Sequence, residues 1–422
     1  MITPEAHELP ELVRDLHRQA AAWQPAGLGH RLSWGPPLPP GITTLSTTAL
    51  NGVVEHSPGD FTITVRAGTP LAQLQAELAD HQQWLALDPA WGAGDSSLGG
   101  LVARGLSGGY RLRHLGVRDQ LIGITLLRAD GTVARAGGRV VKNVAGYDLM
   151  RLFCGSWGSL GLITELTLRT QPLPPHRLGL LVQGELGALT TLAGRVLAAG
   201  LTPERLDHAS PALAAAANQA AAPSLLIGLA SLDATSLQEQ ASAIDQLSPL
   251  TVQRLDPAAL DGLQHALNGR GVTPAWLLRL GVPASRAGEL LANPALAQHP
   301  VQLAAGDGLG MAWGAEAPAL TAAGVAAIRR HCQALGGWLT LLRQPPDSPL
   351  PAWLNAPSRP LIEAIKHQFD PLGQLAPGRL PGVEPESVAP RGALQGSRHT
   401  SGQVGSGLPD QGHGGGGGAP PA

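Results

Sequence analysis

The chain has 422 residues, of which 43% are hydrophobic and 14% are charged, and its net charge is −2. That charged fraction is well below the roughly 25% usual in soluble domains. It argues against nucleic acid as the main partner, because phosphate backbones are bound by clustered Lys and Arg. No run of 18 apolar residues is present and the N-terminus has no basic start with an apolar run, so we expect neither a transmembrane helix nor a signal peptide.

The first part of the chain reads as mixed helix and strand. Apolar spacing predicts a helix over 9–22, and a glycine-containing loop, Pro25–Arg31, follows a short strand. Strands are predicted over 42–50 and 61–65, and Thr69-Pro70 has the N-cap and first-turn residues of another helix. The order helix, strand, strand, helix favours an α+β domain over repeated βαβ units.

Residues 92–163 form a glycine-rich stretch that holds 16 of the 55 glycines. A hairpin is predicted within it, with strands at 121–127 and 133–136, and another strand at 160–168. Glycines at this density let backbone N–H groups approach a bound group closely. Since the chain has few charged side chains, such amides are suited to hold an anionic cofactor, and we interpret the stretch as a flavin (FAD) cradle.

The chain changes character after the proline-rich segment 171–175, where we place a domain boundary. Strand-like runs then alternate with Ala/Leu-rich helices up to about residue 345, which predicts an α/β sandwich of the split-βαβ kind, built either twice or once with additions. The predicted strands are 178–182, 225–229, 276–282, 301–304 and 339–342, and the predicted helices are 187–199, 234–247, 284–292, 318–335 and 358–369. Beyond about residue 384 the composition predicts disorder.

Several common cofactor motifs are missing from the sequence. No GxGxxG follows a strand and opens a helix, which argues against a nicotinamide-binding domain, and no phosphate-binding lysine loop is present. The 14 histidines show no metal-ligand spacing. Cys154 and Cys332 are too few for an iron–sulfur cluster, and we expect both to be buried thiols in a reducing cytoplasm.

Two glycine-rich runs, Gly137–Leu149 and Gly155–Glu165, closely resemble the FAD-binding (E) subunits of bacterial glycolate oxidases. These subunits belong to the FAD-linked oxidases of the vanillyl-alcohol-oxidase or PCMH type. The resemblance covers 1–175 well and 176–383 in outline, and the ending Asp370–Gly378 is also typical. It implies an α+β fold, with a PCMH-type FAD-binding domain of two α+β subdomains at 1–175. A ferredoxin-like α/β cap at 176–383 and a disordered Gly/Pro-rich tail at 384–422 would follow.

The resemblance also implies a set of residues around a non-covalent FAD, whose pyrophosphate would lie between two loops. A handful of hydrogen bonds to charged oxygens, each contributing roughly 1.5–3 kcal/mol, would hold FAD without salt bridges. The implied cofactor-binding residues are Pro25, Ala26, Gly27, Leu28, Gly29, His30, Arg31, Ser97, Leu98, Gly99, Gly100, Gly105, Gly108, Arg118, Asp119, Lys142, Gly146 and Ile163.

Some of these residues have a second interpretation. Arg118 and Asp119 also read as a solvated pair before a strand, and Ile163 as an ordinary core residue. His30 either contacts phosphate or solvent, or attaches the flavin covalently, as a histidine does in some members of the superfamily. Lys142 either stabilises the reduced flavin ring or forms a structural pair with Asp148.

Related hydroxy-acid dehydrogenases carry a metal-binding segment in the second domain with a Gly-Asp-Gly centre between two histidines. Gly306-Asp307-Gly308 matches that centre, but Ala304 and Met311 stand where the histidines would be. Neither residue type holds a hard divalent ion, so we expect no metal site. The match is equally consistent with an ordinary strand-turn-strand. No catalytic residue is identified, because no histidine is well placed to accept the proton in the hydride step.

The resemblance implies an FAD-dependent oxidoreductase acting on CH–OH groups: a cytoplasmic flavoprotein subunit of a glycolate oxidase complex that converts glycolate to glyoxylate. The implied partners are a homologous FAD catalytic subunit and an iron–sulfur subunit, with possible peripheral association at the inner membrane face through the complex. Two alternatives stay open. One is a self-sufficient FAD-dependent dehydrogenase of D-lactate or another small 2-hydroxy acid. The other is a non-catalytic flavin-binding assembly subunit.

Overall fold

A computed structural model describes residues 1–89, 91, 96–138, 147–269, 271–314 and 319–385. These residues form a mixed α+β structure, as the sequence predicts, with two sheet systems that follow one another along the chain. The proposed division between residues 175 and 176 falls between strands β9 (Gln171–Pro172) and β10 (His176–Gln183). Residues 386–422 of the predicted tail lie outside the described residues.

The first subdomain is built from helix α1 (Leu9–Arg18) and two parallel strands, β1 (Trp23–Ala26) and β2 (Thr43–Ser46). The buried face of α1 packs with Trp23 and Leu45 in a small core. The helix ends four residues earlier than the predicted limit of 22, because the chain turns at Ala20, whose φ of 49° is left-handed. This early turn directs the chain into β1, which leads to the loop Pro25–Arg31.

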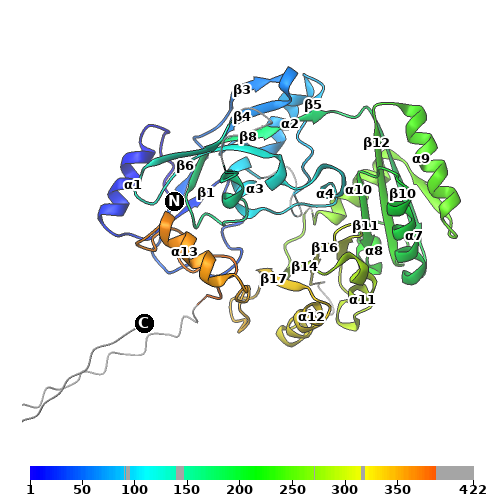
Figure 1. Cartoon of the computed structure of the whole chain (residues 1–422). Coiled ribbons are helices and arrows are strands. Elements are labelled where there is room, and N and C mark those ends of the chain that lie inside the picture. The colour runs from blue at the N-terminus through cyan, green and yellow to red at the C-terminus, as the bar shows by residue number, and fades with distance from the viewer. Residues whose placement is uncertain (90, 92–95, 139–146, 270, 315–318, 386–422) are drawn as a thin grey trace, which may run out of the picture. The chain divides into compact units, whose positions relative to one another are not determined.

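The second subdomain is a five-stranded antiparallel sheet covered by helices α2 (Leu71–Ala79) and α3 (Leu98–Arg104) (Figure 1). The predicted hairpin is confirmed as β6 and β7, while the edge strand β3 was not predicted. The strand order is β3 (Val53–Ser57), β4 (Thr62–Arg66), β8 (Leu162–Arg169), β6 (Leu121–Leu127) and β7 (Val133–Gly137). Smaller elements join them: η1 (Pro58–Asp60), β5 (Gln83–Trp84), α4 (Arg111–His114), α5 (Val117–Gln120) and α6 (Met150–Phe153).

The later part of the chain forms one eight-stranded antiparallel sheet from two ferredoxin-like repeats, so the split βαβ unit is built twice. When the strands of each repeat are numbered in chain order, they lie in the sheet in the order 4-1-3-2. Pairing of β11 with β15 joins the two repeats. The first repeat contains β10, β11 (Arg205–Ala209), β12 (Ser224–Ser231) and β13 (Val252–Leu255). The second contains β14 (Leu277–Gly281), β15 (Val301–Ala304), β16 (Leu309–Trp313) and β17 (Trp338–Arg343).

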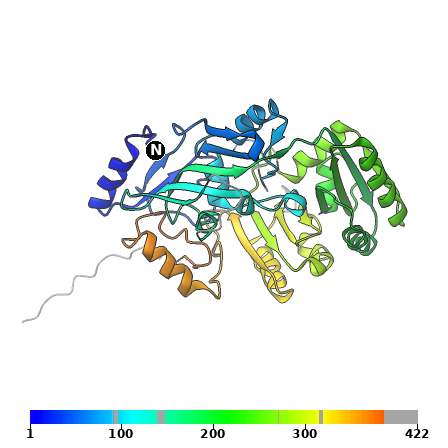
Figure 2. The same cartoon turned by 45° about the horizontal axis from the view of Figure 1, so that its top comes forward.

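Helices cover both faces of this sheet (Figure 2). Leu180 and Val182 pack under one set of helices, whereas Leu181 between them belongs to a core on the opposite face, as the two-residue period of a strand requires. The helices are α7 (Leu186–Ala198), α8 (Pro211–Ala216), α9 (Ala234–Leu247), α10 (Pro257–Leu267), α11 (Ala287–Leu291) and α12 (Ala322–Ala334), with short turns η2 (Ala284–Arg286) and η3 (Pro294–Leu296).

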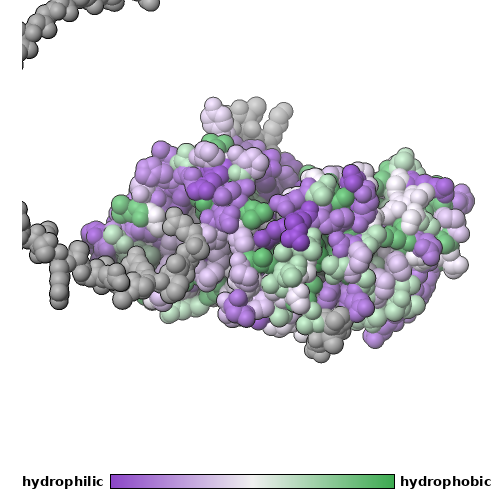
Figure 3. Space-filling model, turned by 90° about the horizontal axis from the view of Figure 1, so that it is seen from below, coloured by the Kyte–Doolittle hydropathy of each residue, from purple (hydrophilic) through white to green (hydrophobic). Residues whose placement is uncertain are grey.

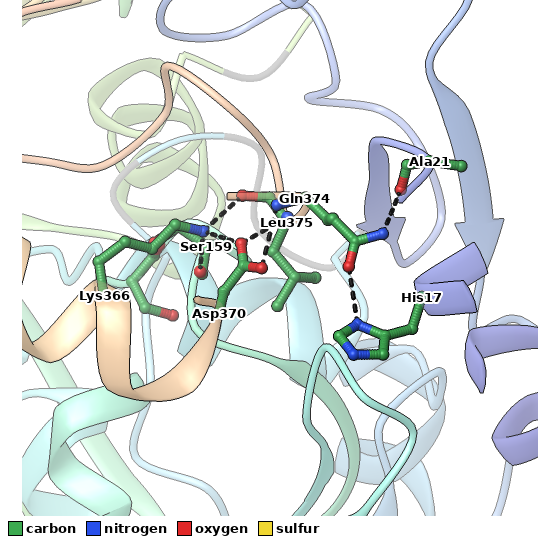
Figure 4. Close-up of polar contacts among 8 residues, drawn as sticks. His17, Ala21, Ser159, Lys366, Asp370, Gln374 and Leu375 are labelled. Carbon is green, nitrogen blue, oxygen red and sulfur yellow. Dashed lines mark hydrogen bonds and ion pairs between the residues drawn. The ribbon is translucent and has the colours of Figure 1, made fainter. Parts of the chain in front are cut away.

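The segment after the last helix, α13 (Arg359–Phe369), returns to the N-terminal subdomain (Figure 4). Lys366 Nζ donates to the carbonyls of Ser159 at 2.7 Å and Leu375 at 2.8 Å, and pairs with the Asp370 carboxylate at 2.5 Å. The Gln374 amide donates to the carbonyl of Ala21 at 2.9 Å. These bonds hold the two ends of the described chain together beside β1.

A buried ion-pair cluster joins the first domain to the eight-stranded sheet. Arg205 Nη2 lies 3.6 Å from Asp88, and its Nε donates to Asp207 at 2.7 Å. Asp88 also accepts hydrogen bonds from the backbone N–H of Tyr110 at 3.2 Å. Burial, only partly offset by Arg205, raises the pKa of Asp88 to about 7. The carboxyl group thus titrates near neutral pH.

The surface shows no large apolar area on the face drawn in Figure 3, where apolar residues are interspersed with polar ones. Among the described residues, no helix is both long and apolar enough to cross a membrane.

Replacement of Asp370 by Asn is expected to destabilise the chain by about 3–5 kcal/mol, because it leaves the largely buried Lys366 ammonium without its counter-ion. Chemical denaturation measures this change. The matched control is Glu363→Gln on the same helix, which breaks the exposed pair with Arg359 and is expected to cost about 0–1 kcal/mol. Equal effects of the two substitutions would contradict the role given to Asp370.

The raised pKa of Asp88 predicts a pH-dependent stability. The native state holds the proton more tightly than the unfolded chain, so this contribution to stability is complete below about pH 4 and is lost as pH rises to about 7. Asp88→Asn cannot titrate and removes this dependence. Denaturation from pH 4 to 8 is expected to give a flatter profile for the variant than for the wild type, and superimposable profiles would rule the prediction out.

Candidate functional site

A first cavity lies between the loop after β1 and the start of α3. Its lining includes Ser96, Ala103, Arg104 and Trp157. Of the residues that the sequence analysis names, the structure brings eleven together here: Pro25, Ala26, Gly27, Leu28, Gly29, His30, Arg31, Ser97, Gly99, Gly100 and Ile163. Residues from four separate parts of the first domain therefore surround one space.

The two loops touch through Gly27 and Ser97. Ser97 is the N-cap of α3, and its Oγ accepts a hydrogen bond from the Gly100 N–H at 3.2 Å. A Cβ atom on Gly27 would lie 1.9 Å from that Oγ, so a larger residue would push the loops apart. The cavity therefore depends on glycine at position 27.

The backbone amides of the two loops differ in what they can bind. The N–H groups of Leu98 and Gly99 donate to the carbonyls of Thr69 and Ala67 at 2.9 and 2.8 Å, and the Gly100 N–H bonds to Ser97. Within the described part of the chain, the N–H groups of Gly27–Gly29 have no acceptor. The first loop is thus the one whose amides are available to an anionic group.

Three arginines that approach the first cavity make the region positive. Arg31 donates to Ser96 Oγ at 2.7 Å, and Arg379 donates to the carbonyls of Leu32 and Pro36. Arg104 Nη2 donates to the Arg31 carbonyl at 2.8 Å. Burial first, and then the charges of Arg379 and Arg31, lower the pKa of Arg104 to about 9. Arg104 and Arg379 were not expected at the site, because their proximity arises only in the folded chain.

A second cavity continues from the first, since Arg104 and Trp157 line both. Its volume is about 290 Å³, and the eight-stranded sheet contributes Arg279 and Thr340. Gly105, the left-handed C-cap of α3, lies here with Arg118. This space lies between the first domain and the later sheet and is close to the size that small ligands need.

Arginine also dominates the second cavity. Arg111 pairs with Asp307 at 2.8 Å, and the Arg279 guanidinium lies 5.3 Å from the Trp338 ring. Burial first, and then the charge of Arg111, lower the pKa of Arg279 to about 10. Arg279 stays cationic at neutral pH, and the cavity therefore favours an anion.

The two cysteines differ from expectation in one respect. Cys332 is buried as expected, but Cys154 is half-buried and lines the second cavity. Burial raises the pKa of Cys154 to about 12, so this thiol stays protonated near neutral pH.

The Gly306-Asp307-Gly308 segment is the tight turn between β15 and β16. Ala304 and Met311 are buried in these strands. No three His, Cys, Asp or Glu side chains in the described ranges gather as metal ligands would. The turn's carboxylate binds Arg111 instead, which places Asp307 near the second cavity.

Several predicted residues lie apart from the first cavity. Leu98 is in the core under the sheet, and Gly108 packs against Asp88. Asp119 accepts from the Gly116 N–H at 3.3 Å and lines neither cavity. Asp148 pairs with Arg151 at 3.1 Å. Lys142 and Gly146 lie outside the described residues.

Comparison with known proteins agrees with this geometry. Residues 3–137 match the family model described as FAD binding domain. Glycolate oxidase subunit GlcE of Escherichia coli (strain K12) is 40% identical over 137 residues, which cover 32% of this chain and 39% of the relative. A mitochondrial cytochrome-type D-lactate dehydrogenase of Arabidopsis thaliana is 34% identical over 148 residues, 35% of this chain and 25% of the relative. The chain thus spans about two fifths or less of these relatives.

The fold extends further than the sequence similarity. A solved structure of alkyldihydroxyacetonephosphate synthase matches with a TM-score of 0.66 over 89% of this chain and 76% of that one, at 14% identity. This likeness shows a common fold that includes the later sheet. Residues 3–137 thus match an FAD binding domain, and most of the chain shares the fold of that synthase structure.

Proposed function

We propose that the chain is the FAD-binding subunit of a glycolate oxidase complex, which oxidises glycolate to glyoxylate and passes the electrons through flavin to an iron–sulfur partner. The observation that carries this proposal is the first cavity, because its two loops lie in the segments that match FAD binding domains. The relative that matches at 40% identity is itself named a glycolate oxidase subunit.

FAD would lie along the two connected cavities. Gly27, Leu28 and Gly29 would donate backbone hydrogen bonds to its phosphates, and Ile163 would cover an apolar part. His30 is exposed at the cavity and would contact phosphate or solvent. When bound, the flavin supplies the acceptor for hydride. The chain's own contribution is to bind and orient it.

The second cavity supports a role in binding the substrate rather than in proton transfer. Its arginines suit a small carboxylate such as a 2-hydroxy acid. Its described lining, however, contains no His, Asp, Glu or Lys side chain that could take the proton of the substrate hydroxyl. We therefore assign the proton transfer to a homologous FAD catalytic subunit. In this proposal the complex is cytoplasmic and associates peripherally with the membrane.

A self-sufficient dehydrogenase of D-lactate or another 2-hydroxy acid is the second candidate. The observation in its favour is the cationic second cavity, where Arg111 and Arg279 lie within one chain. Unlike the first candidate, it requires substrate oxidation without partners.

An absorbance spectrum of the purified chain, before and after anaerobic addition of glycolate or D-lactate, separates the candidates. We expect the visible band of oxidised flavin, unchanged by either acid until the catalytic subunit is added, because the described lining of the second cavity contains no base. Bleaching of the band in the isolated chain would contradict the first candidate and favour the second. A colourless protein that still assembles with its partners would indicate an assembly subunit.

Gly27→Ala is expected to weaken FAD binding by about tenfold or more, since the added methyl group collides with Ser97 and displaces the donating amides. Flavin fluorescence titration measures the dissociation constant. The matched control is Gly59→Ala in the same domain, where a Cβ meets nothing within 4 Å. Unchanged affinity in a folded Gly27→Ala variant would show that FAD binds elsewhere.

A further inference from the structure

Arg104 holds a hydrogen-bond donor that the protein does not use. Its Nη1 is shut off from solvent and has no partner among the residues that the structure describes. Such a donor on a cationic side chain is costly to leave unsatisfied, so an unmet donor calls for an explanation. Arg104 lines the junction of the two cavities, so a molecule bound there would lie beside its side chain.

The guanidinium group is already oriented for binding. Its Nη2 donates to the Arg31 carbonyl at 2.8 Å, and its plane packs on Trp157, with 3.9 Å between the guanidinium carbon and the ring centre. These two contacts fix the side chain before any ligand arrives. An arginine held in this way loses little further entropy on binding.

The surrounding charge favours an anion. Arg379 and Arg31 both add positive charge near Arg104. The hydrogen bonds of Arg379 all go to neutral oxygens. The positive charge around Arg104 therefore suits an anionic group such as a phosphate.

Among the described loop residues, only some backbone donors remain for such a ligand. The amides of Leu98–Gly100 are used within the protein, which leaves those of Gly27–Gly29. A diphosphate group carries charge on both phosphates and needs donors on more than one side. Arg104 lines the same cavity as this loop.

We infer that Arg104 binds a phosphate oxygen of FAD through Nη1 and is the cation that neutralises the FAD diphosphate. This inference rests on the proposed placement of FAD in the first cavity. It changes the expectation that FAD is held without salt bridges. The sequence gives no sign of this role, because Arg104 follows the glycine pair of α3 as an ordinary helix-end residue.

The test is to measure binding of FAD, ADP and riboflavin to the full chain freed of flavin. ADP carries the diphosphate without the flavin, and riboflavin carries the flavin without phosphate. Arg104→Gln is expected to weaken FAD and ADP binding by the same factor, about tenfold to a hundredfold, and to leave riboflavin binding unchanged. The salt dependence of ADP binding is expected to become shallower.

Two further variants control the experiment. Arg113→Gln removes the same charge from an exposed residue that lines neither cavity, and is expected to bind ADP as the wild type does. Arg104→Lys keeps the charge but not the planar fork, and is expected to weaken ADP binding severalfold. Thermal unfolding checks that each variant is folded. If Arg104→Gln does not fold, ADP binding of Arg104→Lys provides the test.

The possible failures are distinguishable. ADP binding of folded Arg104 variants within twofold of the wild type would overturn the inference while leaving the proposed FAD site intact. A loss of riboflavin binding with ADP binding preserved would also overturn it, because Arg104 would then face the flavin ring. A wild-type chain that binds neither FAD nor ADP would overturn the proposed FAD site itself.

Discussion

The candidate site depends on the close approach of two backbone segments, one after β1 and one at the start of α3. Gly27 lies against the Ser97 side chain so tightly that no Cβ fits between them. Ser97 in turn caps α3, and α3 packs into the core of the five-stranded sheet. A single steric requirement therefore connects the cavity wall to the main core of the first domain.

Some of the chain's few charged side chains hold distant segments together. Lys366 and Asp370 fix the C-terminal segment beside β1, and that segment carries Arg379 to the carbonyls of Leu32 and Pro36. Arg205 joins the first domain to the later sheet through Asp88. A chain of low overall charge can thus still carry buried ion pairs, and each of these costs stability when one partner is lost.

Local signals in the sequence predicted part of the fold well. The hairpin of β6 and β7 was predicted to within a residue of its observed strands, and β15 was predicted at the bounds observed. Strand β11 was missed because Arg205, Asp207 and His208 read as an exposed polar segment. All three are buried, and Asp88 from a distant segment supplies part of their pairing. Here tertiary contacts override the local pattern.

In the candidate site, too, local features could be predicted from the sequence and tertiary contacts could not. The resemblance located the loops of the first cavity, since glycines and a helix cap are local features. It gave no role to Arg104, whose environment is made by Trp157, Arg31 and Arg379 from three separate segments. Side chains that act through long-range neighbours carry no local signal, so only the folded structure identifies them.

A crystal structure of the chain with FAD bound would show directly how the cofactor is held. We expect the diphosphate in the first cavity, with phosphate oxygens accepting from the amides of the Gly27–Gly29 loop and from Arg104 Nη1. A diphosphate outside this cavity, or an Arg104 side chain turned away from it, would show that the two loops and Arg104 do not hold FAD.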